Sequence, residues 1–379
     1  MDTRKSFRLK DFLIGLFAGA LLVILTFFVT HTFFKSTIRH TCHTTSVDPT
    51  VPHSPYLLQR DTMDNGFSRD WMIHFYPSEE YWIDMHAHLR GVNSVDNLKQ
   101  MLDNRFAQLD AYRLGKIVAI ADQEDMFNVF NETVAKDPRF AWMYYPKIDN
   151  PSLSLVKDAI KNGACALKIH NVRIIEGKTP RDVFKRKEWQ DIFSFAESAG
   201  IPILWHVTQR HSYSPYHGGG LYAYWQSGWA NGVTFTNEDL LMDFLTILRQ
   251  YPKLKVIGAH QLHVGPKRLN SLFEEYKNLY IDSSCGMYLR WADDFIEKDR
   301  LLLHDFVEKW SERIVFGTDA DIRPENMDEY ALQSFLCHSR FLLKLRLSDK
   351  ALQDVAWRTT SQLMKLQPVS AARRGNVRP

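Results

Sequence analysis

The sequence has little of what several protein classes require. It contains four cysteines in 379 residues, widely spaced and without a Cys-x-x-Cys pair, which argues against a disulfide scaffold or a zinc ribbon. The formal net charge is only +3, and no basic stretch is interleaved with aromatics, so nucleic acid is not expected as a partner. With 45% apolar and 24% charged residues, the remaining composition fits one large globular α/β domain.

One hydrophobic run is long enough to cross a membrane. It covers residues 12–34, its only polar members are threonines and His31, and a helix of this length spans a bilayer. More basic residues precede the run than follow it closely, so the positive-inside rule predicts a single-pass signal anchor with a cytoplasmic N-terminus. The body of the chain would then be extracytoplasmic, and periplasmic in a bacterium. A cleaved signal peptide is the alternative, but the run exceeds a typical apolar region and no Ala-x-Ala-like site follows.

The other boundaries follow from composition. Residues 1–11 form a basic tail that we expect in the cytoplasm, and residues 35–78, rich in Thr, His, Pro and Ser, are typical of a linker or an N-terminal extension. Residues 79–367 carry the pattern of one domain. Residues 368–379 are expected to form a disordered tail.

Within that domain, short apolar runs alternate with amphipathic stretches in eight strand-then-helix units, which predict a parallel sheet. Eight units in succession favour a closed (β/α)8 TIM barrel. A doubly wound open sheet is the alternative, although no Gly-x-Gly-x-x-Gly turn opens a helix as nucleotide binding there requires. The predicted strands are 80–86, 116–121, 140–145, 164–170, 201–206, 254–260, 279–284 and 313–318. The predicted helices are 93–112, 125–136, 152–163, 182–199, 237–250, 267–277, 299–311 and 326–345, and a further helix, 349–365, is expected outside the barrel.

Histidines and an aspartate stand where these apolar runs end. Side chains alternate along a strand, so Asp84, His86 and His88 are expected to share one face, where two imidazoles can reach one divalent cation. His206, His260 and Asp319 each end a later run. In a (β/α)8 barrel the active site forms at the carboxyl ends of the strands, so these side chains are expected to meet. Taken singly, each is more often a structural residue or part of a turn.

Together, the segments Asp84-x-His86-x-His88, His206, His260 and Asp319 resemble the amidohydrolase superfamily of metal-dependent TIM-barrel hydrolases. The resemblance covers about residues 80–367 and is nearest to the amidohydrolase-related branch that includes aminocarboxymuconate-semialdehyde decarboxylase-like enzymes. It implies one divalent metal ion, zinc first among the candidates, held by His86, His88, His206 and Asp319. His260 would lie beside the metal or carry a proton.

The chemistry of such a set agrees with the resemblance. A cation held by nitrogen and oxygen ligands with an open position lowers the pKa of bound water to about 7 and provides a nucleophile. Asp319 is expected to take the proton of the water and pass it to a leaving group, and His260 to polarise a carbonyl or stabilise an oxyanion.

The number of metal ions stays open because of Lys168. Binuclear members of the superfamily carry a carboxylated lysine at the end of strand four, where Lys168 stands, whereas an ion-paired barrel lysine is the alternative. The segment from Asp84 to Arg90 also resembles the dihydroorotase signature, in which the arginine grips a substrate carboxylate. The segments around Asp319 and Asp282 resemble the mononuclear group instead, so we expect one metal ion and keep a second open.

Candidate substrate-binding residues follow the strand ends. Arg90 and Arg290 are expected to bind a carboxylate or phosphate, in preference to Arg210 and Arg323. About thirty residues after His206 form a loop that is expected to act as a lid, and its aromatics, Tyr222 and Trp225 among them, could stack on substrate or simply pack the loop.

The sequence therefore predicts a membrane-anchored metal-dependent hydrolase acting on a carbonyl or similar electrophilic carbon of a small polar substrate. Non-oxidative decarboxylation, or another lyase reaction, on the same metal site is the first alternative. A non-catalytic binding or assembly module at the membrane is the second. A homo-oligomer also stays open.

Overall fold

The computed structural model describes residues 81–366 apart from residues 110–111, 122, 209–230, 285–296 and 324–328. Within these residues, nine strands form one parallel sheet in the order β8-β7-β6-β5-β4-β3-β2-β1-β9. The strands are β1 (Trp82–Leu89), β2 (Leu114–Ala121), β3 (Phe140–Tyr144), β4 (Ala164–His170), β5 (Ile203–His206), β6 (Val256–Gly258), β7 (Leu279–Asp282), β8 (Ile314–Val315) and β9 (Ala320–Ile322).

The two outermost strands in this order, β8 and β9, are halves of one interrupted strand. β8 pairs with β7 and β9 pairs with β1, so the sheet closes on itself. Across the interruption, the backbone N–H of Met85 donates to the carbonyl of Phe316 (3.0 Å) and the N–H of Asp319 to the carbonyl of His86 (2.6 Å). The nine strands therefore form an eight-stranded barrel, as the sequence predicts.

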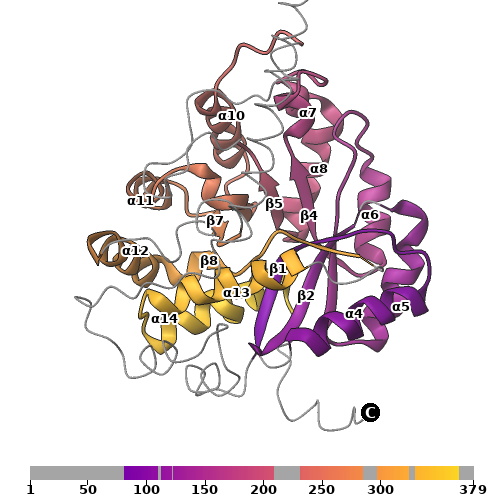
Figure 1. Ribbon diagram of the computed structural model, residues 1–379. Coiled ribbons are helices and arrows are strands. Elements are labelled where there is room, and N and C mark those ends of the chain that lie inside the picture. The colour runs from indigo at the N-terminus through magenta and orange to yellow at the C-terminus, as the bar shows by residue number, and fades with distance from the viewer. Residues whose placement is uncertain are drawn as a thin grey trace, which may run out of the picture. The chain divides into compact units, whose positions relative to one another are not determined.

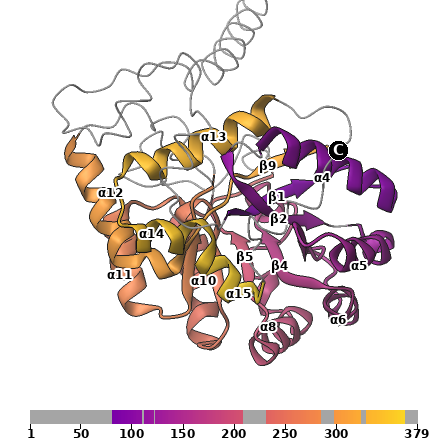
Figure 2. The same ribbon diagram turned by 90° about the horizontal axis from the view of Figure 1, so that it is seen from below.

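Helices surround this barrel and follow the strands in turn (Figures 1 and 2). They are α4 (Val95–Leu109), α5 (Phe127–Lys136), α6 (Leu153–Lys161), α7 (Val172–Ile175), α8 (Lys187–Ala199), α10 (Asn237–Gln250), α11 (Pro266–Glu275), α12 (Glu297–Trp310), α13 (Glu329–Lys344), α14 (Asp349–Gln353) and α15 (Thr359–Met364). All nine predicted helices are present with small shifts at their ends. The last contains a π-helical turn over Asp354–Arg358 between α14 and α15, and α7 was not predicted.

Local signals explain several helix ends. Thr236 and Asp239 form a capping box at the start of α10, in which each side chain accepts from the backbone of the other residue. Pro266 opens α11, where its missing N–H leaves no hydrogen bond unmade. Gly200 ends α8 with a φ of +66°, a conformation that glycine adopts without steric penalty.

Apolar side chains fill two layers, one between strands and helices and one inside the barrel. Every residue of β2 is buried, as expected of a parallel strand covered on both faces. The inner layer includes Ile83, Met143 and Leu204. Leu363 and Met364 of α15 join it, and the sulfur of Met364 lies 3.9 Å from that of Cys165 near the start of β4. Helix α15 therefore closes the amino-terminal end of the barrel and leaves the carboxyl end for a site.

Several predictions fall outside the described residues. They concern the apolar run 12–34, the linker 35–78, most of the expected lid loop (209–230) and the tail 368–379. In the part of the chain that the structure describes, no helix combines the length and apolar character needed to cross a membrane.

Candidate metal centre

The predicted residues come from different strands and reach the carboxyl end of the barrel. His86 and His88 lie on β1, Asp319 lies between β8 and β9, and His260 follows β6. These elements are brought together by the closure of the sheet, because β1 is bonded directly to the interrupted last strand.

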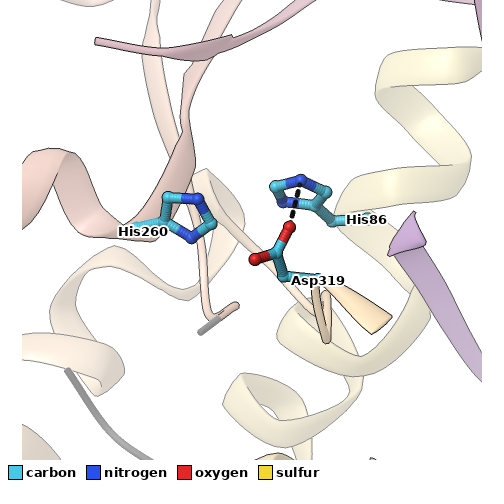
Figure 3. A group of neighbouring side chains, drawn as sticks. All are labelled: His86, His260 and Asp319. Atoms are coloured by element: carbon cyan, nitrogen blue, oxygen red, sulfur yellow. Dashed lines mark ion pairs between the residues drawn. The ribbon is translucent and has the colours of Figure 1, made fainter. Parts of the chain in front are cut away.

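One carboxylate oxygen is the centre of the arrangement. Nε2 of His86 lies 3.1 Å from Oδ1 of Asp319, and Nε2 of His88 lies 3.0 Å from the same oxygen. His86, His260 and Asp319 each offer an atom within 4.8 Å of the others, a spacing that could hold a metal ion. Figure 3 shows the carboxylate of Asp319 lying between the imidazole rings of His86 and His260.

The histidines of β1 face this centre because the strand is irregular. Pairing with β2 shifts register between Asp84 and Ala87. Ile83 and Met85 belong to the apolar layer inside the barrel, whereas the alternation changes within the shifted stretch, so that His86 and His88 face the site. The expectation that Asp84 shares their face is therefore wrong. Fully buried, Asp84 accepts hydrogen bonds from the backbone N–H (3.0 Å) and the hydroxyl (2.7 Å) of Thr318, and so anchors the segment that carries Asp319.

Sequence reasoning missed the role of Asp282, at the end of β7. Its Oδ2 lies 2.6 Å from Nδ1 of His86, and both side chains are fully buried. The hydroxyl of Ser284 donates to the same oxygen (2.6 Å). Metal-binding histidines commonly donate their second ring nitrogen to a carboxylate, which fixes the ring and leaves the other nitrogen for the metal. The signal available in the sequence was the position of Asp282 at a strand end, like the other site residues.

His260 is held by an unusual turn. The strand predicted over 254–260 stops at Gly258, and four consecutive residues, His260–His263, have φ between 51° and 56°. Each non-glycine residue in a left-handed conformation costs about 1–2 kcal/mol. Tertiary bonds hold the turn: the side-chain amide of Gln261 donates to the carbonyls of Asp282 (2.7 Å) and Ser284 (3.1 Å). Oδ1 of Asp282 also accepts from the backbone N–H of His260 (2.6 Å).

His206 contacts the ring of His260, which lies between it and the carboxylate of Asp319. Its Nδ1 is 3.2 Å from Nε2 of His260, and its Nε2 is 3.0 Å from the carbonyl oxygen of Thr208. Among the described residues, the group whose atoms converge contains His260 rather than His206. The structure thus places His206 beside the centre, behind His260.

Lys168 is fully buried in β4, and its Nζ lies 3.1 Å from Nε2 of His86. Burial lowers the pKa of Lys168 to about 8. The lysine therefore loses its charge near pH 8, whereas the pKa of an ordinary lysine is 10.5.

Of the predicted substrate-binding residues, the structure describes Arg90 alone. It is half exposed, and its Nη2 lies 3.4 Å from Nδ1 of His88 while its Nε donates to Asp321 (3.3 Å). Arg323 donates to the other oxygen of Asp321 (3.1 Å). Arg290, Tyr222 and Trp225 lie outside the described residues, as does Arg210.

Charges in the site separate into two kinds. Burial and the charge of Lys168 act to lower the pKa of His86, but Asp319 and Asp282 outweigh them and raise it. Burial would raise the pKa of Asp282, yet the hydrogen bond and charge of His86 lower it to about 2. The charges of His86 and His260 likewise outweigh burial and hold the pKa of Asp319 well below its usual range. Burial lowers the pKa of His88, and it lowers the pKa of His260 to about 4. Around His86, the carboxylates of Asp282 and Asp319 are therefore ionised at neutral pH, and the rings of His88 and His260 are neutral.

This donor set fits a divalent cation. Two ligand atoms bonded tetrahedrally at about 2.0–2.1 Å lie about 3.3 Å apart, close to the 3.0 and 3.1 Å that separate the histidine nitrogens from Oδ1 of Asp319. The carboxylate of Asp282 orients His86 as metal-binding histidines require.

Comparison with known proteins identifies the family. Residues 83–360 match the family model described as Amidohydrolase. The chain belongs to the amidohydrolase family. It is therefore a metal-dependent enzyme, for which hydrolysis and decarboxylation are both open, and the resemblance seen in the sequence is confirmed.

No curated protein matches this amidohydrolase. Among solved structures, dihydroorotase from Saccharomyces cerevisiae in complex with 5-fluoroorotic acid is 12% identical, with a TM-score of 0.51 over 76% of this chain and 85% of that one. Dihydroorotase from Campylobacter jejuni is 16% identical (TM-score 0.48; 76% and 84% covered). A dihydroxybenzoic acid decarboxylase from Polaromonas with bound manganese is 14% identical (TM-score 0.46; 76% and 97% covered). At such identities, the likeness to the yeast enzyme shows the fold alone.

Proposed function

We propose that this amidohydrolase is a hydrolase that uses one divalent cation, zinc first among the candidates, to attack a carbonyl or similar electrophilic carbon of a small polar substrate. The observation that carries the proposal is the meeting of two imidazole nitrogens at one oxygen of Asp319. His86, His88 and Asp319 would hold the cation, and His206 would join them as the fourth ligand. When bound, such a cation supplies a nucleophile at neutral pH by lowering the pKa of water.

Asp319 and His260 have the protonation states that the reaction needs. Asp319 is ionised at neutral pH, so its carboxylate can accept the proton of the attacking water and return it to the leaving group. His260 is neutral at that pH, and its ring can donate a hydrogen bond to the oxygen on which negative charge develops.

We further propose that Arg90 binds an anionic group of the substrate. Its guanidinium lies beside His88 and is half exposed, so a carboxylate can reach it without leaving water completely. From the sequence pattern alone, we also propose Arg290, Tyr222 and Trp225 as substrate-binding residues. Lys168, once carboxylated, would be a ligand of a second cation.

Metal analysis of the full-length protein tests the proposal. We expect about one equivalent of zinc or another divalent ion per chain, lost in His86→Ala. Replacing His304 on α12, where its Nδ1 faces the carbonyl of Leu345, is the matched control and should leave the metal content unchanged. Asp319→Asn should abolish turnover with partial loss of metal. A folded wild-type protein that binds no divalent ion would refute the proposal.

Decarboxylation is the second candidate because the site holds a buried proton donor. A decarboxylase must deliver a proton to carbon, and the ammonium group of Lys168 lies 3.1 Å from His86 Nε2 and is protonated below about pH 8. The two reactions separate on their products. Release of carbon dioxide from a dihydroxybenzoic acid by the metal-loaded protein would favour the decarboxylase, and hydrolysis of cyclic amides such as dihydroorotate without carbon dioxide would favour the hydrolase.

We also propose that residues 12–34 anchor the enzyme in a membrane with the barrel outside the cytoplasm. The length and apolar character of this run and the basic residues before it support the proposal. A protease added to intact cells, or in a bacterium to spheroplasts that lack the outer membrane, should remove a C-terminal tag. A tag that is digested only after lysis would contradict the orientation.

A further inference from the structure

A histidine that the proposed mechanism does not use stands at the mouth of the barrel. His170 ends β4 two residues after Lys168, and side chains two apart on a regular strand share a face. Its backbone pairs in register with His206, and the two rings lie 4.0 Å apart between centroids. His170 therefore faces the same space as the candidate metal centre, one layer above Lys168.

The position of the proton on this ring is set by the backbone. The N–H of Val172 donates to Nδ1 of His170 at 2.8 Å. Because a backbone amide can only donate, Nδ1 must carry a lone pair, and the single proton of the neutral ring is left on Nε2. An imidazolium would turn two N–H groups toward each other.

Electrostatics favours the same form. Burial and the charge of Lys168 lower the pKa of His170 well below its usual value, and nearby His260 and His88 act in the same direction. Asp319 opposes them but does not outweigh them. This direction agrees with the tautomer that the contact with Val172 already sets.

The N–H at Nε2 is available to a ligand. Among the described residues, none accepts a hydrogen bond from it, and the ring is only partly buried. Water can satisfy such a group at little cost, and a substrate oxygen can replace that water.

We propose that His170 is a substrate-binding residue whose neutral Nε2–H donates a hydrogen bond to an oxygen of the substrate. The inference rests on the proposed function, since the oxygen it would bind is that of the carbonyl under attack. As the electron pair of the C=O bond moves onto oxygen, the hydrogen bond strengthens, and His170 keeps its proton throughout. A neutral imidazole used in this way stabilises the oxyanion without acting as an acid, a role known from another barrel enzyme, triosephosphate isomerase.

The tautomer can be tested without a substrate. In the full-length protein labelled with nitrogen-15 on histidine, the signals lost in His170→Gln identify this ring. We expect one nitrogen without a proton and one with a proton between pH 6 and 8, the protonated one being Nε2. A ring protonated at Nδ1, or doubly protonated in this range, would overturn the proposal.

Two substitutions separate ligand binding from the contact with Val172. Asparagine places an oxygen where Nδ1 lies but has no group at the position of Nε2, whereas glutamine places an amide N–H near Nε2. With acetohydroxamate as the probe on zinc-loaded protein, His170→Asn should weaken binding about 10-fold, the loss of one hydrogen bond, and His170→Gln should recover most of it. His304→Gln on α12 is the control and should bind as the wild type does.

The possible failures are distinguishable. If the wild type binds no zinc, the proposed function fails, and the nuclear magnetic resonance result still decides the tautomer. If zinc binds but His170→Asn, with an unchanged unfolding temperature, binds the probe as tightly as the wild type, the role of His170 is refuted.

Discussion

Asp282 offers the sharpest test of how the site is built, because its carboxylate accepts from four buried donors. Oδ2 accepts from Nδ1 of His86 and the hydroxyl of Ser284, both at 2.6 Å. Oδ1 accepts from the backbone N–H groups of His260 (2.6 Å) and Ser284 (3.4 Å). Asp282→Asn keeps one oxygen and replaces the other with an amide nitrogen that can only donate. Whichever way the amide is oriented, one pair of donors loses its acceptor.

The size of the effect follows from this count. Each buried donor left without an acceptor costs about 1–3 kcal/mol, so the substitution should lower the free energy of unfolding by about 2–6 kcal/mol. If the amide turns its nitrogen to His86, the ring also loses the partner that fixes its orientation. The affinity for zinc should then fall about 10- to 100-fold.

Urea unfolding of metal-free protein and zinc competition with a chelator measure the two effects. Asp243→Asn is the matched control, because this carboxylate binds Arg181 (2.5 and 3.0 Å) with 38% of its side chain exposed. It should cost no more than about 1 kcal/mol and leave zinc affinity unchanged. An Asp282→Asn protein as stable as the control, with wild-type zinc affinity, would show that the carboxylate does not hold His86.

Two further predictions follow from the same site. In Gly317→Ala, the new Cβ would lie 2.7 Å from Cβ of His86, so we expect about 1–3 kcal/mol of destabilisation and weaker zinc binding, both measured as above. Gly200→Ala, at a φ of +66° at the end of α8, should cost about 1–2 kcal/mol without affecting zinc, and an equal loss of affinity in both variants would contradict this reasoning. Because the pKa of Asp282 falls from 3.8 to about 2 on folding, its contribution to stability is present above pH 3.8 and is lost as the pH falls toward 2. Urea unfolding of metal-free protein between pH 4.5 and 3 should therefore show a steeper loss of stability in Asp243→Asn than in Asp282→Asn, and equal slopes would refute the assignment.

The barrel could be predicted from the sequence, and so could the gathering of His86, His88, His260 and Asp319 at its carboxyl end. Runs such as that of β2 are apolar on both faces because the strand is covered by helices and by the barrel interior, and this pattern is local. His86, His88, His260 and Asp319 could be selected because the carboxyl ends of parallel strands lie at one end of a barrel. That rule places residues at the same end without giving their contacts.

The contacts depend on departures from regular strands, which periodicity does not reveal. A register shift in β1 separates Asp84 from His86 and His88, and the interruption between β8 and β9 turns Asp319 inward with a φ of +57°. The left-handed turn at His260–His263 brings His260 to the centre ahead of His206. Each of these local conformations is costly and persists because hydrogen bonds from distant segments hold it.

The sequence by itself thus determined the order of the elements, the end of the barrel that carries the site and the chemistry of its donors, since these follow from local apolar patterns and residue types. Only the tertiary structure decided which donors share an oxygen, that Asp282 supports His86, and that Val172 sets the proton on His170. Those facts depend on backbone geometry fixed by contacts between residues far apart in the chain.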